Sequence, residues 1–170
     1  MKQFLILAIS LLLFSSYALA KCQGEEGRFE LVTTDQYFDR LTGLIWYRCP
    51  RIMENTSCFN FYNHMTFSEA LAVAQHYSND TEKWRLPNIK ELVSIMDYDC
   101  GSWQPHIIEP LMPFGAYDFW SATPNNHPHK VSAWIMSLNG VVKKMDYFSR
   151  PMDEASVFLV REPINDTERK

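Results

Sequence analysis

The stretch Trp84-Arg85-Leu86-Pro87-Asn88-Ile89-Lys90-Glu91-Leu92 carries the strongest local structural signal in this sequence. Asn88 is a good helix cap and Glu91 stands three residues later, so each side chain can accept a hydrogen bond from the other residue's backbone N–H group. Behind this capping box, apolar residues follow the spacing of one buried helix face: Ile89, Leu92, Val93 and Met96. The stretch therefore predicts a helix that starts after Asn88 and packs against a hydrophobic core.

A second capping box lies upstream, where Thr66 is the cap and Glu69 stands three residues later. Another buried-face pattern follows it: Phe67, Ala70, Leu71 and Ala74. Short apolar and aromatic runs predict strands on both sides of these two helices, at 29–32, 44–47, 119–123 and 157–160. Because the two helices are consecutive and do not alternate with strands, the sequence predicts an α+β fold with a small, mostly antiparallel sheet.

Turn-forming residues divide the rest of the chain. Residues 37–43 predict a turn, since they contain Asp39 and the Thr42-Gly43 pair. Residues 97–118 are rich in Pro and Gly and predict a long structured loop, and a loop with Pro, Asn and His is expected after Thr123. The clearest hairpin is predicted at 133–145, where apolar strands flank Asn139-Gly140, a pair that suits a tight type I′ turn.

Residues 1–20 have the features of a cleaved signal peptide. Lys2 precedes an apolar run, and Ala18-Leu19-Ala20 places small residues where signal peptidase reads them. The apolar run is shorter than the roughly 20 residues that span a bilayer, and Lys21 before Cys22 argues against a lipoprotein. We expect cleavage after Ala20 and an exported protein in the periplasm, in the extracellular space or at the cell surface, with no membrane span after cleavage.

Residues 21–161 are expected to form one domain, because no repeat, low-complexity tract or linker divides them, and 162–170 are expected to be a polar tail. Loss of Lys2 from the 16 Lys and Arg residues leaves 15 basic residues against 20 Asp and Glu residues. Nucleic-acid binding needs clustered positive charge, and this mildly acidic balance does not supply it. We therefore expect no nucleic-acid partner.

Four cysteines in an exported chain predict two disulfides. Three pairings of Cys22, Cys49, Cys58 and Cys100 are possible. We expect Cys49–Cys58, because closing a short loop costs little entropy, and Cys22–Cys100 from the remaining two. A thiolate metal site is not expected, since the sequence has no C-x-x-C motif.

The motifs of common catalytic and metal sites do not occur in this sequence. It has no G-x-S-x-G, no H-E-x-x-H and no Gly-rich phosphate loop. His127 and His129 lack a third ligand nearby, and Asp97, Asp99 and Glu109 match no calcium-loop spacing. We therefore expect no catalytic residues, no cofactor and no bound metal.

Aromatic residues make up 14% of the chain, including five tryptophans. Trp103 and Tyr117 lie in the predicted loop, where aromatic rings can form platforms for sugar rings or partner side chains. Lys143, Lys144 and Arg150 form a basic cluster near the predicted hairpin that could hold an anionic group. These five residues are the candidate binding residues. The other tryptophans are in or beside predicted strands and are expected to be mostly buried: Trp46, Trp84, Trp120 and Trp134.

Several motifs, in their order along the chain, resemble one bacterial family. They are Phe38-Asp39-Arg40-Leu41-Thr42-Gly43-Leu44-Ile45-Trp46, Thr66-Phe67-Ser68-Glu69-Ala70-Leu71, the stretch 84–92, Phe119-Trp120-Ser121-Ala122-Thr123, Ala133-Trp134, Asn139-Gly140 and Val160-Arg161. Residues 37–161 thereby resemble the C-terminal domain of the Legionella collagen-like adhesin, a domain formerly of unknown function. The resemblance implies an exported bacterial protein with a C-type-lectin-like α+β fold that is related to that of the formylglycine-generating enzymes. The two disulfides expected from the cysteine count would staple this fold.

The namesake of this family binds sulfated glycosaminoglycans and supports adhesion and biofilm formation. This chain departs from it, since no Gly-X-Y repeat precedes the domain and the lectin calcium motifs Glu-Pro-Asn and Trp-Asn-Asp are absent. Many relatives carry a Cys in the closing strand, where this chain has Val157-Phe158-Leu159-Val160. That difference supports Cys22 as the partner of Cys100. The matching motifs are expected to be scaffold, and no ligand residue is carried over from the family.

Three functions remain open from the sequence. We favour a noncatalytic binding or adhesion module that recognises a glycan or a sulfated polyanion at the bacterial envelope. The second is a domain that binds another envelope protein, which the acidic net charge favours over polyanion binding. The third and least favoured is an enzyme related to the formylglycine-generating oxidases, whose chemistry needs a reactive cysteine pair.

Overall fold

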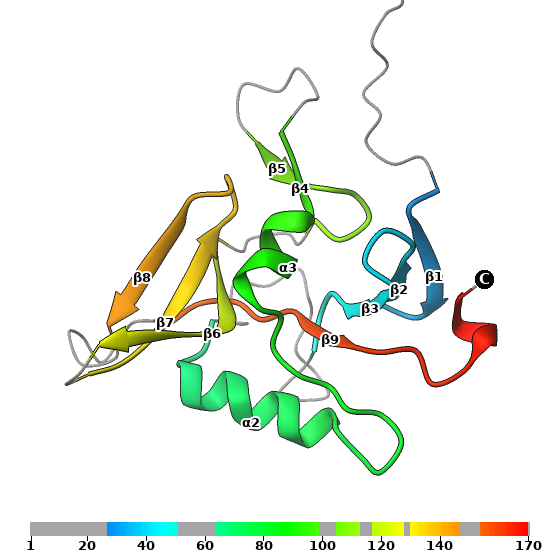
Figure 1. Cartoon of the computed structure of the whole chain (residues 1–170), viewed down its shortest axis with the longest axis horizontal. Helices are drawn as coiled ribbons and strands as arrows, with labels where there is room; N and C mark the ends of the chain where they lie inside the picture. The colour runs from blue at the N-terminus through cyan, green and yellow to red at the C-terminus, as the bar shows by residue number, and fades with distance from the viewer. Residues whose placement is uncertain are drawn as a thin grey trace, which may run out of the picture.

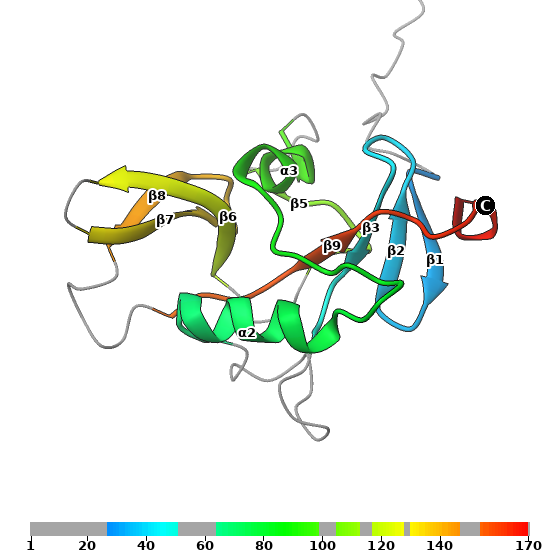
Figure 2. The ribbon, with the colours of Figure 1, turned by 60° about the horizontal axis from the view of Figure 1, so that its bottom comes forward.

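The computed structural model describes residues 27–50, 64–98, 105–112, 117–127, 130–146 and 154–169. In these residues the chain forms an α+β domain with two α-helices and three small antiparallel sheets. This confirms the predicted α+β class and its two helices, but the one small sheet that was expected is divided into three, and the C-type-lectin-like fold stays a prediction. Figures 1 and 2 show the two larger sheets at opposite ends of the domain, with the helices between them. No helix in this part of the chain is long and apolar enough to cross a membrane.

The first sheet has four strands in the order β1-β2-β3-β9. They are β1 (Phe29–Thr33), β2 (Gln36–Asp39), β3 (Leu44–Tyr47) and β9 (Leu159–Arg161). The predicted turn at 37–43 is wrong in its first half, because Tyr37 and Phe38 pair with Trp46 and Ile45 as part of β2. The turn itself is confined to 40–43, where Gly43 takes a positive φ of 73°.

The two predicted helices are confirmed as α2 (Phe67–Tyr77) and α3 (Ile89–Ser94), and both capping boxes are formed. Helix α3 is shorter than the apolar spacing predicts. Its cap Ile95 leaves the helical region with φ −93° and ψ 11°, and the Ser94 hydroxyl donates to the Glu91 carbonyl at 2.7 Å. Met96 therefore belongs to β4 (Met96–Asp97), which pairs with β5 (His106–Ile107) inside the predicted long loop.

The second sheet has the order β6-β7-β8 and consists of β6 (Asp118–His127), β7 (Lys130–Ser137) and β8 (Val142–Asp146). Strand β6 runs through the loop predicted after Thr123, because residues 124–127 pair with 130–133. The β6–β7 register shifts between Trp120 and Pro124. In this irregular part Ala122 donates its N–H to the Pro87 carbonyl at 2.8 Å, so the shift turns the β6 backbone toward the start of α3.

The predicted β7–β8 hairpin is confirmed, but its turn is not type I′. Type I′ needs a positive φ at both central residues, whereas Gly140 has a φ of 78° and Asn139 is not among the described non-glycine residues with positive φ. The Gly140 N–H bonds to the Ser137 carbonyl at 2.8 Å, and the Ser137 N–H bonds to the Val141 carbonyl at 2.8 Å. The chain therefore makes a three-residue loop, in which only the glycine needs the left-handed conformation.

Residues 155–161 connect the two larger sheets. Ser156 forms a parallel bridge to Phe119 at the start of β6, and Val160 pairs with both Trp46 on β3 and Arg85. Between these contacts the Phe158 ring stacks on Phe119, with ring centroids 4.8 Å apart. The apolar core accordingly has two buried clusters, one that includes α2 and one that includes α3. Trp46, Trp84 and Trp120 are buried as expected, and Trp134 is partly exposed.

The segment predicted to be a polar tail is attached to the domain. Residues Asp166–Arg169 form a 3-10 helix, and Glu168 makes a bidentate ion pair with Arg161, with N–O distances of 2.9 and 2.7 Å. Arg161 is 2% exposed and lies over the Trp84 ring, 4.9 Å from its centroid. A buried guanidinium needs a charged partner, so the chain beyond β9 turns back to supply one.

Cys49 is the single cysteine among the described residues. It is 2% exposed and disulfide-bonded. Its three possible partners, Cys22, Cys58 and Cys100, lie outside the described residues, as do residues 1–20 with the expected signal peptide. The two expected pairings and the cleavage after Ala20 therefore stay predictions.

Candidate functional site

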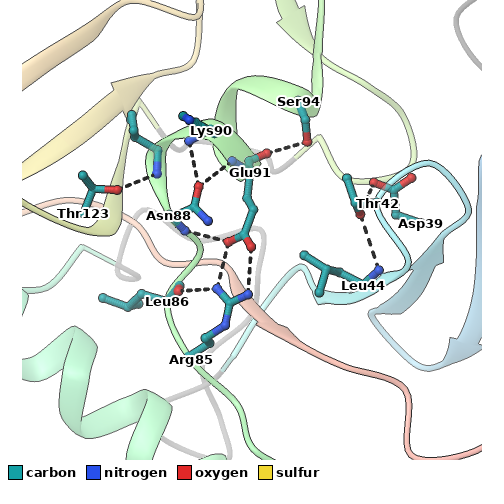
Figure 3. Close-up of polar contacts among 11 residues, drawn as sticks. Asp39, Thr42, Leu44, Arg85, Leu86, Asn88, Lys90, Glu91, Ser94 and Thr123 are labelled. Carbon is teal, nitrogen blue, oxygen red and sulfur yellow. Dashed lines mark hydrogen bonds and ion pairs between the residues drawn. The ribbon is translucent and has the colours of Figure 1, made fainter.

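The strongest sequence motif forms a closed hydrogen-bond network at the start of α3 (Figure 3). Arg85 makes a bidentate ion pair with Glu91, and both N–O distances are 2.8 Å. Glu91 also accepts the Asn88 N–H at 2.7 Å, while the Asn88 side chain accepts two backbone N–H groups of the first helical turn. Thr123 on β6 accepts the Ile89 N–H at 2.9 Å, so the network ties α3 to the second sheet.

The charged side chains of this network are paired with other groups of the same protein. Burial raises the pKa of the Glu91 carboxyl, but hydrogen bonds from Arg85 and the Asn88 N–H outweigh burial and leave the pKa below its ordinary value. The hydrogen bond to Glu91 likewise raises the pKa of the Arg85 guanidinium. Because Arg85 and Glu91 bond to each other and to the backbone of the same segment, the motif stabilises the scaffold.

A second internal ion pair holds the turn between β2 and β3. Asp39 has no exposed surface and accepts two hydrogen bonds from Arg28, at 2.6 and 2.8 Å. It also accepts the Thr42 hydroxyl at 2.7 Å, and Figure 3 shows Thr42 beside it. Burial raises the pKa of Asp39, but the bonds from Arg28 and Thr42 outweigh it and lower the pKa. This carboxylate is also structural.

Figure 1 shows the β7–β8 turn close to the β4–β5 pair. Residues of this region line a pocket of about 610 Å³. Three segments that are distant in the sequence form it: β5 and the residues around it, the start of β6, and the β7–β8 hairpin. We call it the Tyr117 groove. Its lining residues are Pro105, His106, Met112, Tyr117, Asp118, Ser137, Leu138, Asn139 and Lys143.

Two of the lining residues of the Tyr117 groove form an ion pair. Lys143 on β8 donates to Asp118 on β6 at 3.0 Å, and the two side chains are 50% and 23% exposed. Asp118 is paired with Ser137, and Lys143 with Ile135, so the bridge links the two outer strands across β7. An ion pair this exposed adds little to stability. Its consequence is electrostatic, because it neutralises the lysine of the groove.

Two exposed tyrosines lie next to the β7–β8 turn. Tyr117 is 63% exposed, and its backbone carbonyl accepts the Leu138 N–H at 2.6 Å. Tyr98 is 54% exposed, and its hydroxyl lies so close to Gly140 that a Cβ added there would be 3.1 Å from it. The turn is therefore held in place by a backbone hydrogen bond to Tyr117 and by the side chain of Tyr98.

Polar groups complete the lining of the groove. The Ser137 hydroxyl donates to the Asn139 side-chain oxygen, and the NH₂ group of the same amide is a further hydrogen-bond donor in the lining. His106 Nδ1 is buried and has no hydrogen-bond partner among the described residues. A buried polar atom without a partner costs free energy, so a water molecule bonded to this nitrogen would be stabilising.

The structure brings together two of the five predicted binding residues, Tyr117 and Lys143, in one groove. Lys144 faces the other side of β8, since neighbouring strand residues alternate, and its ammonium lies 5.1 Å from the Trp134 ring centroid. The two lysines therefore do not form one positive patch. Trp103 and Arg150 lie outside the described residues.

Asp118, Asn139 and His106 line the groove but were not singled out from the sequence. Asp118 directly follows Tyr117 in the sequence and is the first residue of β6. An acidic side chain next to a candidate binding residue is the one local signal that could have identified it. The sequence indicates only a turn role for Asn139, and His106 lies in a predicted loop that has no recognisable pattern. No group of three His, Cys, Asp or Glu side chains among the described residues could hold a metal ion.

These features define a small α+β domain with an internally paired scaffold and a groove lined by both polar and apolar side chains, among them the exposed Tyr117. The chain belongs to the Lcl C-terminal domain family, whose model matches residues 35–161. No curated protein and no solved structure gives a significant match to the chain. Family membership suggests a secreted or surface adhesin-like module rather than a catalytic domain.

Proposed function

We propose that this protein is an exported, noncatalytic binding module of the bacterial envelope, and that the Tyr117 groove is its ligand-binding face for a glycan. The observation that carries the proposal is the largely exposed Tyr117 ring beside the Asp118–Lys143 pair in a pocket of about 610 Å³. Family membership supports the adhesin-like part of the proposal.

The chemistry of the groove suits a sugar ring. A pyranose has an apolar C–H face with partial positive charge, which packs on the negative face of an aromatic ring such as Tyr117. Its edge carries hydroxyl groups that both donate and accept hydrogen bonds. Asp118 accepts, while Lys143 and the Asn139 amide donate, so both kinds of bond are available beside the ring.

The noncatalytic part of the proposal is supported by the partners of the charged side chains. The acids with clearly lowered pKa values bond to groups of the chain itself, as Asp39 does to Arg28, Glu91 to Arg85 and Glu168 to Arg161. Strongly perturbed groups in a pocket are the usual mark of catalysis. Here the perturbed acids belong to the scaffold and do not line the Tyr117 groove.

A second candidate function is the binding of another envelope protein along β1. Strand β1 is the outer strand of its sheet among the described strands, and Leu31 on it is 67% exposed. An extended segment of a partner can add to such an edge through backbone hydrogen bonds. This candidate places the binding face at the opposite end of the domain from the Tyr117 groove.

A glycan panel tests the proposal. The purified, oxidised protein is applied to immobilised neutral, acidic and sulfated glycans, with Tyr117→Ala and Lys143→Met as groove variants. Lys144→Met is the matched control, because it removes the neighbouring charge from the opposite face of β8. We expect binding that falls at least about tenfold in both groove variants and is unchanged in the control. Binding that all three variants retain, or silence across the panel, would contradict it.

A further inference from the structure

We infer that the Tyr117 groove selects uncharged, hydroxyl-rich saccharides and discriminates against sulfated or carboxylated ones. The inference rests on the proposed function, since it specifies the ligand class of the same groove. It departs from what the charge pattern of the sequence suggested, in which Lys143, Lys144 and Arg150 would gather around an anionic group.

The lysine and the carboxylate that line the groove balance each other in charge. The lining contains one lysine and one carboxylate, and they pair with each other at 3.0 Å. An anionic group that approaches Lys143 must either displace Asp118 or lie close to its negative charge, and both are unfavourable. The lining therefore has no uncompensated lysine or arginine among the described residues.

The residues around the groove and the net charge of the chain also affect the binding of an anion. The ammonium of Lys144 lies over the Trp134 ring on the other face of β8, so it is not placed to contact a ligand in the groove. The chain as a whole carries a net charge of −4, which repels a polyanion at long range. Both features weaken binding that depends on counterion release and favour binding that is independent of salt.

A partly exposed ion pair can still form hydrogen bonds to a neutral ligand. The Lys143 ammonium has three N–H donors, and the bond to Asp118 uses one of them. The carboxylate of Asp118 keeps acceptor capacity beyond this bond. Donor and acceptor thus stand side by side, which matches two adjacent hydroxyl groups that accept from Lys143 and donate to Asp118 while the sugar ring contacts Tyr117.

The experiment compares wild type with Asp118→Asn, which nearly preserves shape but leaves Lys143 uncompensated. Binding to a neutral glucan and to heparin is measured at roughly 50 mM and roughly 500 mM salt. We expect wild type to bind the neutral saccharide with less than about a twofold change between the two salt concentrations. Asp118→Asn should weaken neutral binding about tenfold and gain heparin binding that disappears at high salt.

The outcomes separate this inference from the proposed function. Wild-type binding to heparin alone, lost with salt and with Lys143→Met, would overturn neutral selectivity while leaving a glycan-binding groove in place. Neutral binding that Asp118→Asn and Tyr117→Ala leave unchanged would overturn the inference, because the ligand would lie elsewhere. Failure of wild type to bind any saccharide would overturn both. A circular-dichroism melt of each variant shows that loss of binding does not come from unfolding.

Discussion

Asp39 shows how a single charged residue fixes the local structure of this protein. The sequence marked it as a turn former, and the structure shows a fully buried carboxylate that accepts bonds from Arg28, Thr42 and the Leu41 N–H. Its partner Arg28 is 6% exposed and also donates to the Ser94 carbonyl, so the pair joins β1, β2 and the end of α3. One pair of charges therefore links elements that the sequence alone does not bring together.

Replacement of Asp39 by Asn should destabilise the protein by about 3–5 kcal/mol, because it leaves the Arg28 guanidinium buried without a counter-charge. Urea denaturation followed by tryptophan fluorescence measures the loss. Asp166→Asn is the control, since Asp166 is 98% exposed and its ion pair with Arg169 is long, at 3.8 Å. It should leave stability unchanged. Equal effects of the two substitutions would contradict the structural role of Asp39.

At the scale of elements, local signals predicted α2, α3 and the β7–β8 hairpin because caps, apolar spacing and turn residues act over a few positions. The end of α3 was missed, since Met96 fits the helical spacing but is drawn into β4 by pairing with Ile107. The turn type was missed because Asn139-Gly140 is compatible with more than one loop. The groove could not be predicted as a whole, because His106, Asp118 and Lys143 meet only through tertiary contacts.

The β7–β8 loop supplies a prediction at this scale. Gly140→Ala should cost about 1–2 kcal/mol, because its φ of 78° disfavours a side chain and the new Cβ would be 3.1 Å from the Tyr98 hydroxyl. Asn139→Ala should cost less, since Asn139 is not among the residues with positive φ. Thermal unfolding of both variants measures the difference, and a larger loss for Asn139→Ala would favour the type I′ turn that the sequence suggested.

At the scale of the whole molecule, three buried or part-buried carboxylates make stability depend on pH. Burial raises the pKa of Asp39 and of Glu91, but their partners outweigh it, and Arg161 lowers the pKa of Glu168 against weaker burial. A carboxyl with a lower pKa in the folded state binds fewer protons there than in the unfolded state. Its stabilising effect is therefore present above the unfolded pKa and is lost as the pH falls through the folded pKa.

The free energy of unfolding should accordingly be steady above about pH 5 and fall as the pH is lowered toward about 3. Denaturation curves across this range measure it. Glu168→Gln should lower stability at neutral pH and reduce the slope below about pH 5, because its contribution no longer titrates. If the free energy of unfolding had the same pH dependence in Glu168→Gln as in wild type, the ion pair between Glu168 and Arg161 would not form in solution.

The disulfide pattern belongs to the same scale. Cys49 is disulfide-bonded, and we predict Cys58 as its partner, with Cys22 bonded to Cys100. Peptide mapping without reduction should recover both bonds, and reduction should destabilise the protein by about 2–4 kcal/mol for each bond lost. A bond from Cys49 to Cys22 or Cys100 would refute this pairing, and free thiols would reopen the question of a reactive cysteine.

The most direct test of the binding face is a map of the residues that respond to ligand. Isotope-labelled protein is titrated with the saccharide that binds best in the glycan panel, and backbone amide shifts are recorded by NMR. The account predicts that the largest changes fall on the Tyr117 groove, at Tyr117, Leu138, Asn139 and Lys143. Changes that cluster on β1 and β2, with the Tyr117 groove unaffected, would contradict it and place the ligand at the other end of the domain.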